Sequence, residues 1–176
     1  WMSRSSVVWG PFSIVWGLAI ALVTQLLYRY KDKPTSWLFI AGTLLGGAYE
    51  YLCSVFTEIV FGAVFWDYSA IPFNLGGRIN LLYCFFWGFA AVAWFKLLYP
   101  PISATIEKLP TRFGTVLTWA LCLFMALDMV VSSAALIRYN DRLNGVPAQG
   151  AVAEYLDEHY DNDRMHKVYP KAVHTS

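Results

Sequence analysis

The sequence carries little charge for its length. Only 14% of its 176 residues are Asp, Glu, Lys or Arg, whereas soluble domains average about 25%. A soluble globule of this size needs more charge to cover its surface. The 57% share of hydrophobic residues excludes a disordered chain, and the net charge of +1 offers no field that would recruit nucleic acid. This composition indicates an integral membrane protein.

Cysteine is scarce, and its pattern excludes two kinds of site. The three cysteines are isolated within apolar stretches: Cys53, Cys84 and Cys122. Because no CxxC pair occurs, the sequence indicates neither a disulfide framework nor a structural zinc site. The histidines lie in the C-terminal tail at spacings that do not match metal ligation: His159, His166 and His174. We expect no cofactor and no metal.

Common catalytic motifs are also lacking. The chain has no GxxxxGK[ST], HExxH or GxSxG sequence, so it does not itself hydrolyse ATP by the P-loop route. This favours a protein that is not an enzyme. One enzymatic alternative stays open, a lipid-modifying membrane enzyme in which Glu50, Asp67 and Asp128 act as general acids and bases.

Four segments are long and apolar enough to cross a bilayer, which takes about 20 mostly apolar residues. They cover residues 11–28, 36–61, 79–99 and 113–137. We expect Pro100-Pro101 to end the third segment. The sequence therefore predicts an all-α, polytopic transmembrane bundle of four spans at residues 1–138, followed by a short polar tail at 139–176 with a helix at 151–160. The chain begins Trp1-Met2, and we expect a further segment upstream.

The connector at residues 62–78, between the second and third segments, is unusual. It is too apolar for an ordinary solvated loop and too rich in Gly, Pro and Asn for a helix. Irregular backbone at membrane depth needs protein or a water-filled cavity to satisfy its peptide groups. We expect either a re-entrant-like connector that folds back onto the mouth of the bundle or an aromatic loop at the membrane interface.

Glu50 in the second predicted span and Asp128 in the fourth lie deep within apolar runs, whereas Glu58 lies near the end of the second span, close to the interface. Both spans start on the same side of the membrane, and Glu50 and Asp128 each lie roughly 21 Å along their span at 1.5 Å per residue. We therefore expect them in one leaflet, close to the start of the third span and Arg78. Intramembrane carboxylates usually face a bundle interior or a cavity.

This acidic cluster has two interpretations, which are compatible. Arg78 pairs with one or two of the carboxylates and ties the connector to the bundle, or the cluster lines a cavity that binds a cation, a proton or a polar head group. A further pattern, Gly42-Thr-Leu-Leu-Gly46, permits close helix approach either within the bundle or between protomers, so a homo-oligomer is one expectation.

Several runs together resemble one bacterial membrane family, labelled putative ABC-transporter type IV permease, or CmpB. They are Gly10-Pro11-Phe12, Tyr49-Glu50-Tyr51-Leu52-Cys53-Ser54, Phe61-Gly62-Ala63-Val64-Phe65-Trp66-Asp67-Tyr68-Ser69, Pro72-Phe73-Asn74-Leu75-Gly76-Gly77-Arg78-Ile79, Trp87-Gly88, Leu156-Asp157-Glu158-His159-Tyr160 and Val168-Tyr169-Pro170. The resemblance implies five spans, hence one helix upstream of this chain, and a place in the bacterial inner membrane. It marks Glu50, Trp66, Asp67, Tyr68, Asn74 and Arg78 as site candidates without a catalytic role, and the depth argument adds Asp128.

The orientation in the membrane stays open. Six Lys and Arg residues accompany the loops at 29–34 and 96–112, against four near the opposite face, which weakly favours those loops as cytoplasmic. The resemblance implies the reverse, with the connector and the tail facing the cytoplasm.

Three functions follow as hypotheses. The first is a permease component of a transporter that forms a homo-oligomer or pairs with an ATPase subunit, with its site at Glu50 and Asp128. The second is a membrane scaffold or sensor that binds a partner through its tail, and the third is the lipid-modifying enzyme. In each case the lipid bilayer is a partner and nucleic acid is not.

Overall fold

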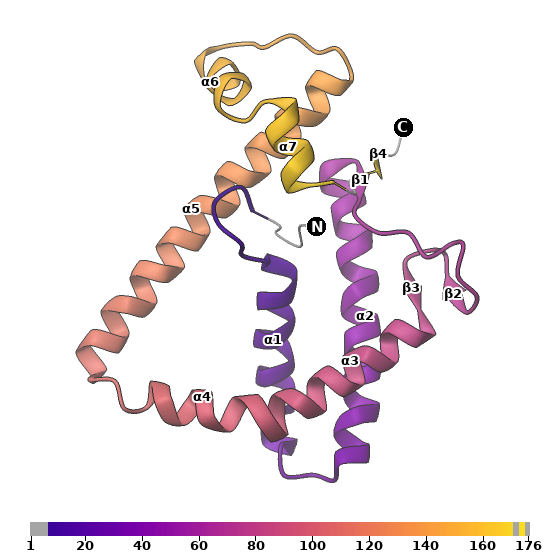
Figure 1. Cartoon of the computed structure of the whole chain (residues 1–176), viewed down its shortest axis with the longest axis vertical. Coiled ribbons are helices and arrows are strands. Elements are labelled where there is room, and N and C mark those ends of the chain that lie inside the picture. The colour runs from indigo at the N-terminus through magenta and orange to yellow at the C-terminus, as the bar shows by residue number, and fades with distance from the viewer. Residues whose placement is uncertain (1–6, 171–172, 175–176) are drawn as a thin grey trace. The chain divides into compact units, whose positions relative to one another are not determined.

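The computed structural model describes residues 7–170 and 173–174, so the expectation about Trp1-Met2 lies outside the described residues. The chain separates into two compact units, and Figure 1 labels the helices and strands that belong to them. The span unit comprises residues 16–55 and 67–120, and the tail unit comprises 56–66, 121–176 and the described part of 1–15. The boundaries of these units do not test the predicted division into a bundle at 1–138 and a tail at 139–176, which stays a prediction.

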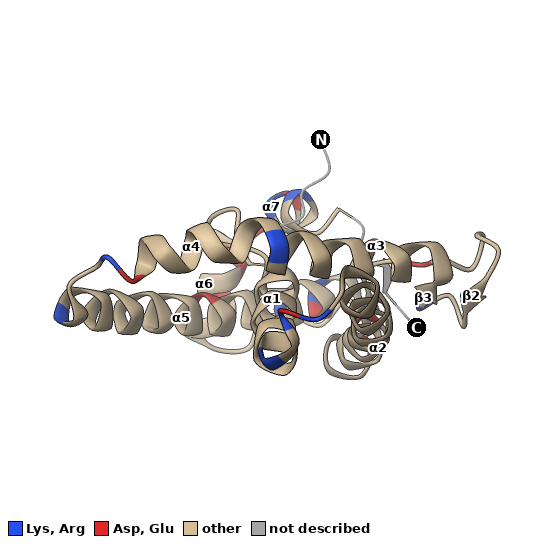
Figure 2. Cartoon of the chain, turned by 90° about the horizontal axis from the view of Figure 1, so that it is seen from below, with Lys and Arg blue, Asp and Glu red and all other residues tan. Residues whose placement is uncertain are grey.

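Long helices make up most of the chain. Helix α1 (Ile14–Leu27) continues into a 3-10 turn (Tyr28–Tyr30), and α2 covers Thr35–Phe61. Helix α3 (Leu81–Ala93), a π turn (Trp94–Leu98) and α4 (Tyr99–Ile106) follow one another without a break, and α5 covers Thr111–Leu143. Among the described residues, three stretches are long and apolar enough to cross a membrane, Thr35–Phe61, Leu81–Ile106 and Thr111–Leu143, and Ile14–Tyr30 is a shorter apolar one. Long parts of these helices carry no charge (Figure 2), and the predicted all-α membrane fold is confirmed.

The prediction that Pro100-Pro101 would end the third span is wrong. The helix passes through both prolines and ends at Ile106, because the π turn precedes them. The N–H of Tyr99 donates to the Trp94 carbonyl, five residues back, which starts α4 afresh at Tyr99. Both prolines then lie in the first turn of α4, where a missing N–H costs little.

Small residues bring α2 and α3 into close contact within the span unit. A Cβ atom on Gly42 would collide with Ala91, and one on Gly46 would collide with the Cβ and ring of Trp87. The reverse holds on α3, where a Cβ on Gly88 would collide with the Thr43 hydroxyl. Of the two uses predicted for the small-residue pattern, the structure shows the one within the chain.

The π turn after α3 is tied to α1 and to the loop before α2. A small core of buried residues, Leu27, Leu38 and Phe95, joins α1, α2 and the π turn. The indole Nε1 of Trp94 donates to Thr24 Oγ1 at 2.8 Å. Lys96 Nζ donates to the backbone carbonyl of Lys31 at 2.8 Å, so its charge meets peptide oxygens at the end of the span. These contacts fix the helices that frame the connector.

The connector is irregular, as expected, and contains short strands. They are β1 (Ala63–Val64), β2 (Asn74–Leu75) and β3 (Ile79–Asn80), of which β2 and β3 pair antiparallel with Leu75 opposite Ile79. Gly76 and Gly77, between the paired strands, have φ of 59° and 70°, which glycine adopts without strain. The result is a tight hairpin directly before α3.

The C-terminal tail is folded onto the end of α5. Helix α6 (Ala151–His159) confirms the predicted short helix, α7 covers Asn162–Val168, and β4 (Val173–His174) pairs with β1. A core of buried residues spans these elements: Val8, Ala135, Leu136, Tyr139, Leu156, Tyr160, Met165 and Tyr169. The polar composition of the tail therefore hides an apolar face that the sequence analysis did not identify.

Candidate functional site

The side chain of Glu50 is the central group of the candidate site. Glu50 lies on α2, about 22 Å from the first residue of a helix about 40 Å long at 1.5 Å per residue. It is 9% exposed although it carries a carboxylate. The Tyr68 hydroxyl donates to Oε1 at 2.7 Å, and the Trp87 indole Nε1 donates to Oε2 at 3.1 Å. In the described chain, both hydrogen-bond partners of this carboxylate are therefore neutral.

Aromatic rings hold the two donors in place. The ring of Tyr68 stacks on Tyr83 with a centroid distance of 4.7 Å, and Trp87 packs against Trp16 at the same distance. Tyr49 meets the Trp87 indole edge to face at 6.2 Å. Burial and the hydrogen bond to Glu50 raise the pKa of Tyr68, so its hydroxyl keeps its proton and remains a donor. The carboxylate thus lies in an aromatic surrounding that shields it from water.

Arg78 is attached to the same face of α2, one turn beyond Glu50. Its Nη1 donates to Ser54 Oγ at 3.1 Å, and Ser54 is buried. Residues four apart on a helix lie one above the other, so the guanidinium lies next to the carboxylate site along the helix. Ser54, one turn beyond Glu50, is therefore a point at which the connector attaches to α2.

Two other site candidates shape the connector itself. Asp67 Oδ1 accepts hydrogen bonds from the backbone N–H and the hydroxyl of Ser69, at 2.8 and 2.5 Å, and these bonds lower the pKa of Asp67. Asn74 donates to the Ile71 carbonyl at 2.8 Å and accepts from the Gly77 N–H at 3.0 Å. Such bonds stabilise tight turns, so these residues position Tyr68 and Arg78.

The last two candidates, Trp66 and Asp128, belong to the tail unit, whereas Glu50 belongs to the span unit. The predicted common depth of Glu50 and Asp128 therefore stays a prediction. Asp128 lies on α5 and is 0% exposed, and its Oδ1 accepts from the Trp9 backbone N–H at 3.2 Å and from Ser132 Oγ at 3.1 Å. Its Oδ2 has no hydrogen-bond partner among the described residues. This group ties the N-terminal segment to α5.

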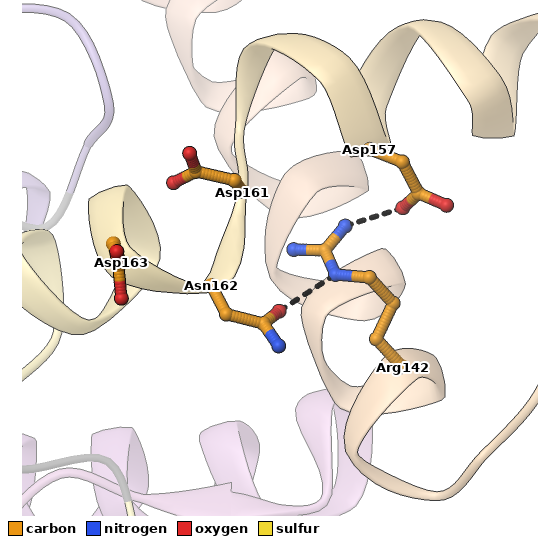
Figure 3. A pocket seen from close by; sticks show the side chains of 5 residues that line it. All are labelled: Arg142, Asp157, Asp161, Asn162 and Asp163. Atoms are coloured by element: carbon orange, nitrogen blue, oxygen red, sulfur yellow. Dashed lines mark hydrogen bonds and ion pairs between the residues drawn. The ribbon is translucent and has the colours of Figure 1, made fainter.

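A charged cluster that was not predicted from the sequence anchors the tail to the end of α5. Arg138 and Arg142, one turn apart at the end of α5, both bind Asp157 of α6, with N–O distances of 2.8 and 2.5 Å. They lower the pKa of Asp157 to about 2. Beside them lies an open pocket of about 350 Å³ (Figure 3), lined by Arg142, Asp157, Asp161, Asn162 and Asp163. The four-residue spacing of Arg138 and Arg142 could have indicated a shared acidic partner, but that partner, Asp157, lies beyond a linker in the sequence.

Trp87 was also missed as a site residue. It lies 37 residues from Glu50 in the sequence, too far for any local pattern to pair them. The Trp87-Gly88 dipeptide belonged to the resemblance described above, which was the only signal that singled it out.

The fold and the buried carboxylate define the class of this chain, a multi-pass helical membrane protein with a polar site in an apolar helix. The chain belongs to the family described as Putative ABC-transporter type IV, whose model matches residues 1–133. All seven predicted site residues lie within the match, whereas the tail residues that resembled the family lie beyond it. No curated protein and no solved structure matches the chain.

Proposed function

We propose that the chain is the membrane-embedded permease component of a transporter in the bacterial cell membrane, and that Glu50 binds the cation, proton or cationic head group on which the transporter acts. One observation carries this proposal: a buried carboxylate in a membrane helix is held by two neutral donors, the Tyr68 hydroxyl and the Trp87 indole. The membership of an ABC-transporter-related family supports the transporter context.

The charge on Glu50 is costly at this buried position. Placing an ionised carboxylate in the middle of a membrane helix costs about 2.5–3.5 kcal/mol on insertion scales. Two neutral hydrogen bonds stabilise the carboxylate without neutralising it, and the Arg78 guanidinium, bonded to Ser54 one turn further along α2, offsets its charge only in part. A carboxylate has about four acceptor positions, and the structure uses two of them. A bound proton, metal cation or ammonium group would compensate the charge and use the remaining positions.

The connector links this site to the surface of the unit. Tyr68 is the connector residue that reaches Glu50, and Arg78 fixes the connector to α2 through Ser54. A movement of the connector would remove one of the two donors of Glu50. The proposed role of the connector is therefore to open and close access to the carboxylate.

The site is tested through Trp87, whose indole touches the carboxylate. Full-length protein in lipid nanodiscs is labelled with fluorotryptophan, and the Trp87→Phe variant assigns the resonance. Protons, Na⁺, K⁺, Mg²⁺ and ethanolamine are then titrated separately. At least one probe should shift the Trp87 resonance in the wild type and leave it unchanged in Glu50→Gln, which retains the shape and one carbonyl acceptor. If no probe shifts it, or if both proteins respond alike, Glu50 is not the binding group.

The transporter context needs a separate test. Native mass spectrometry of full-length protein, extracted gently from its own membrane, reports oligomeric state and partners together. A co-extracted ATPase subunit is the expected result, alone or with a second copy of the chain. A complex that contains this chain and lipid only would overturn the permease assignment and leave the Glu50 site to be judged by its own test.

The folded tail favours a second candidate, a scaffold that binds a cytoplasmic partner. Helix α6 packs Leu156 inward and leaves Val152 and Tyr155 outside, 74% and 53% exposed. Deleting residues 151–176 is a poor test, because it would also strip the core around Leu136. The Val152→Asp and Tyr155→Ala variants keep that core. If they abolish the capture of a partner while the Trp87 response persists, the scaffold role is supported.

A further inference from the structure

Three exposed apolar residues lead into the connector hairpin along its first strand, before the Gly76-Gly77 turn, and are called the connector tip: Ile71, Phe73 and Leu75. Phe73 is 81% exposed and Leu75 is 62% exposed, and Ile71 beside them is also exposed. Phe73 has φ of 62°, in the left-handed region that bulky side chains rarely adopt. A strained backbone that presents a phenylalanine outward needs a compensating contact, and the described part of the span unit leaves most of that side chain uncovered.

The connector tip is joined to the first turn of α3 at the open end of the hairpin. The N–H of Leu81 donates to the Phe73 carbonyl at 3.1 Å, and Asn80 Nδ2 donates to the Pro72 carbonyl at 2.6 Å. The side chain of Asn80 also caps α3 by accepting from the Leu82 N–H. The backbone of the tip is therefore held directly against the start of a helix that is long and apolar enough to cross the membrane.

The outer surface of α3 continues the apolar surface of the tip. Leu81 and Leu82 of its first turn are exposed, as are Phe86 and Phe89 further along. On an apolar helix that is long enough to cross a membrane, side chains that the rest of the described chain leaves exposed are expected to face lipid. The Leu81–Phe73 bond places the connector tip next to this lipid-facing surface of α3.

We propose that the connector tip, Ile71, Phe73 and Leu75, inserts into the lipid bilayer at the level where α3 begins, and that this anchor holds Tyr68 against Glu50. Tyr68 belongs to the same turn structure, since its N–H donates to the Gly77 carbonyl and its carbonyl accepts from the Ile71 N–H, both at 2.8 Å. Withdrawal of the tip from lipid would pull on the donor of the carboxylate. The second half of this inference rests on the proposed function of Glu50, whereas the first half does not.

The position of the tip is measured with an environment-sensitive fluorophore. Phe73→Cys and, as a control, Lys108→Cys in the polar loop after α4 are labelled in full-length protein whose three native cysteines are replaced by alanine. Vesicles of phosphatidylcholine and phosphatidylglycerol then carry either a doxyl quencher near the headgroup or iodide in the water. The label at position 73 should be quenched several-fold more by doxyl lipid than the label at 108, and less by iodide. Equal quenching at the two positions overturns the anchor.

A pair of substitutions separates the anchor from the backbone strain. If residue 73 matters only for the conformation of the backbone, Phe73→Asn should be tolerated better than Phe73→Leu, because Asn adopts the left-handed conformation more readily. A lipid anchor favours Phe73→Leu, which keeps an apolar side chain. In nanodiscs, the Trp87 resonance of Phe73→Leu should match that of the wild type, and that of Phe73→Asn should shift. The opposite order overturns the coupling to the carboxylate. The ligand titration with Glu50→Gln fails or succeeds independently of the quenching result.

Discussion

Replacing Gly46 by alanine tests whether the contact of α2 with α3 supports the Glu50 site. The added Cβ would overlap the Cβ, Cγ and Cδ2 atoms of Trp87. These atoms lie next to the backbone, so the ring cannot rotate away as the end of a flexible side chain would. Either the two helices separate or the indole moves, and the indole carries the 3.1 Å bond to Glu50.

The expected loss of stability follows from two contributions. Forcing an extra methyl group into a packed contact costs about 1–3 kcal/mol. A hydrogen bond to a charged group contributes about 1.5–3 kcal/mol, and it is lost if the indole moves. Alanine recovers about 0.5–1 kcal/mol through its helix propensity. The free energy of unfolding of Gly46→Ala should therefore fall by roughly 2–5 kcal/mol.

Gly17 provides the matched control. It lies on α1, and a Cβ built on it meets no atom within 4 Å, so Gly17→Ala should be neutral or gain about 0.5–1 kcal/mol. Both variants are unfolded reversibly by titrating a denaturing detergent into mixed micelles, with circular dichroism as the readout. If the two variants differ by less than about 0.5 kcal/mol, the range typical of surface substitutions, the packing described for α2 and α3 is wrong.

Three further predictions concern other contacts. Asp157→Asn should release the tail to limited proteolysis at neutral pH, whereas Asp163→Asn should not. In the wild type, the stabilisation from Asp157 should be complete above its unfolded pKa of about 3.9 and should be lost as the pH falls through its folded pKa of about 2. Protection from proteolysis that is constant down to pH 2 would contradict the binding of Asp157 by Arg138 and Arg142. Asp128→Asn should be at least as stable as the wild type in the detergent titration, because it removes a buried charge. Asp128→Leu should lose about 1–3 kcal/mol of unfolding free energy, because it leaves the donors of Asp128 unpaired. Equal stability of the two variants would refute this role of Asp128. Trp94→Phe should lose about 0.5–1.5 kcal/mol with its bond to Thr24 in the same titration, and no loss would show that this bond does not stabilise α1.

Hydropathy alone was enough to predict the helical membrane fold. The apolar runs at 36–61 and 113–137 lie within helices of the structure, because a run that long has few alternatives to a membrane helix. The end of the third helix was mispredicted because a π turn depends on hydrogen bonding across five residues, which the sequence around Pro100 does not reveal. Local rules for proline assume a regular helix before it.

The candidate site was predicted only in part, because its contacts connect distant parts of the chain. Glu50 was evident as a charge within an apolar run. Its donors Tyr68 and Trp87 lie 18 and 37 residues away, and their approach depends on the hairpin and on the glycine contacts of α2. The buried face of the tail was missed for a related reason, since Leu156 and Met165 lie on two helices separated by a break, among charged residues.

The π turn at Trp94–Leu98 has a consequence for changes in chain length. A π turn contains one residue more than the α-helical turn it replaces, so the stretch behaves as if one residue had been inserted into α3. Deleting a residue there would restore the regular helix and rotate the part of the helix beyond it by about 100°. Pro100 would then lie inside an unbroken α-helix, where its ring collides with the carbonyl four residues earlier. The extra residue and the two prolines therefore depend on one another, and a shortened chain would tolerate the deletion only if the prolines were replaced at the same time.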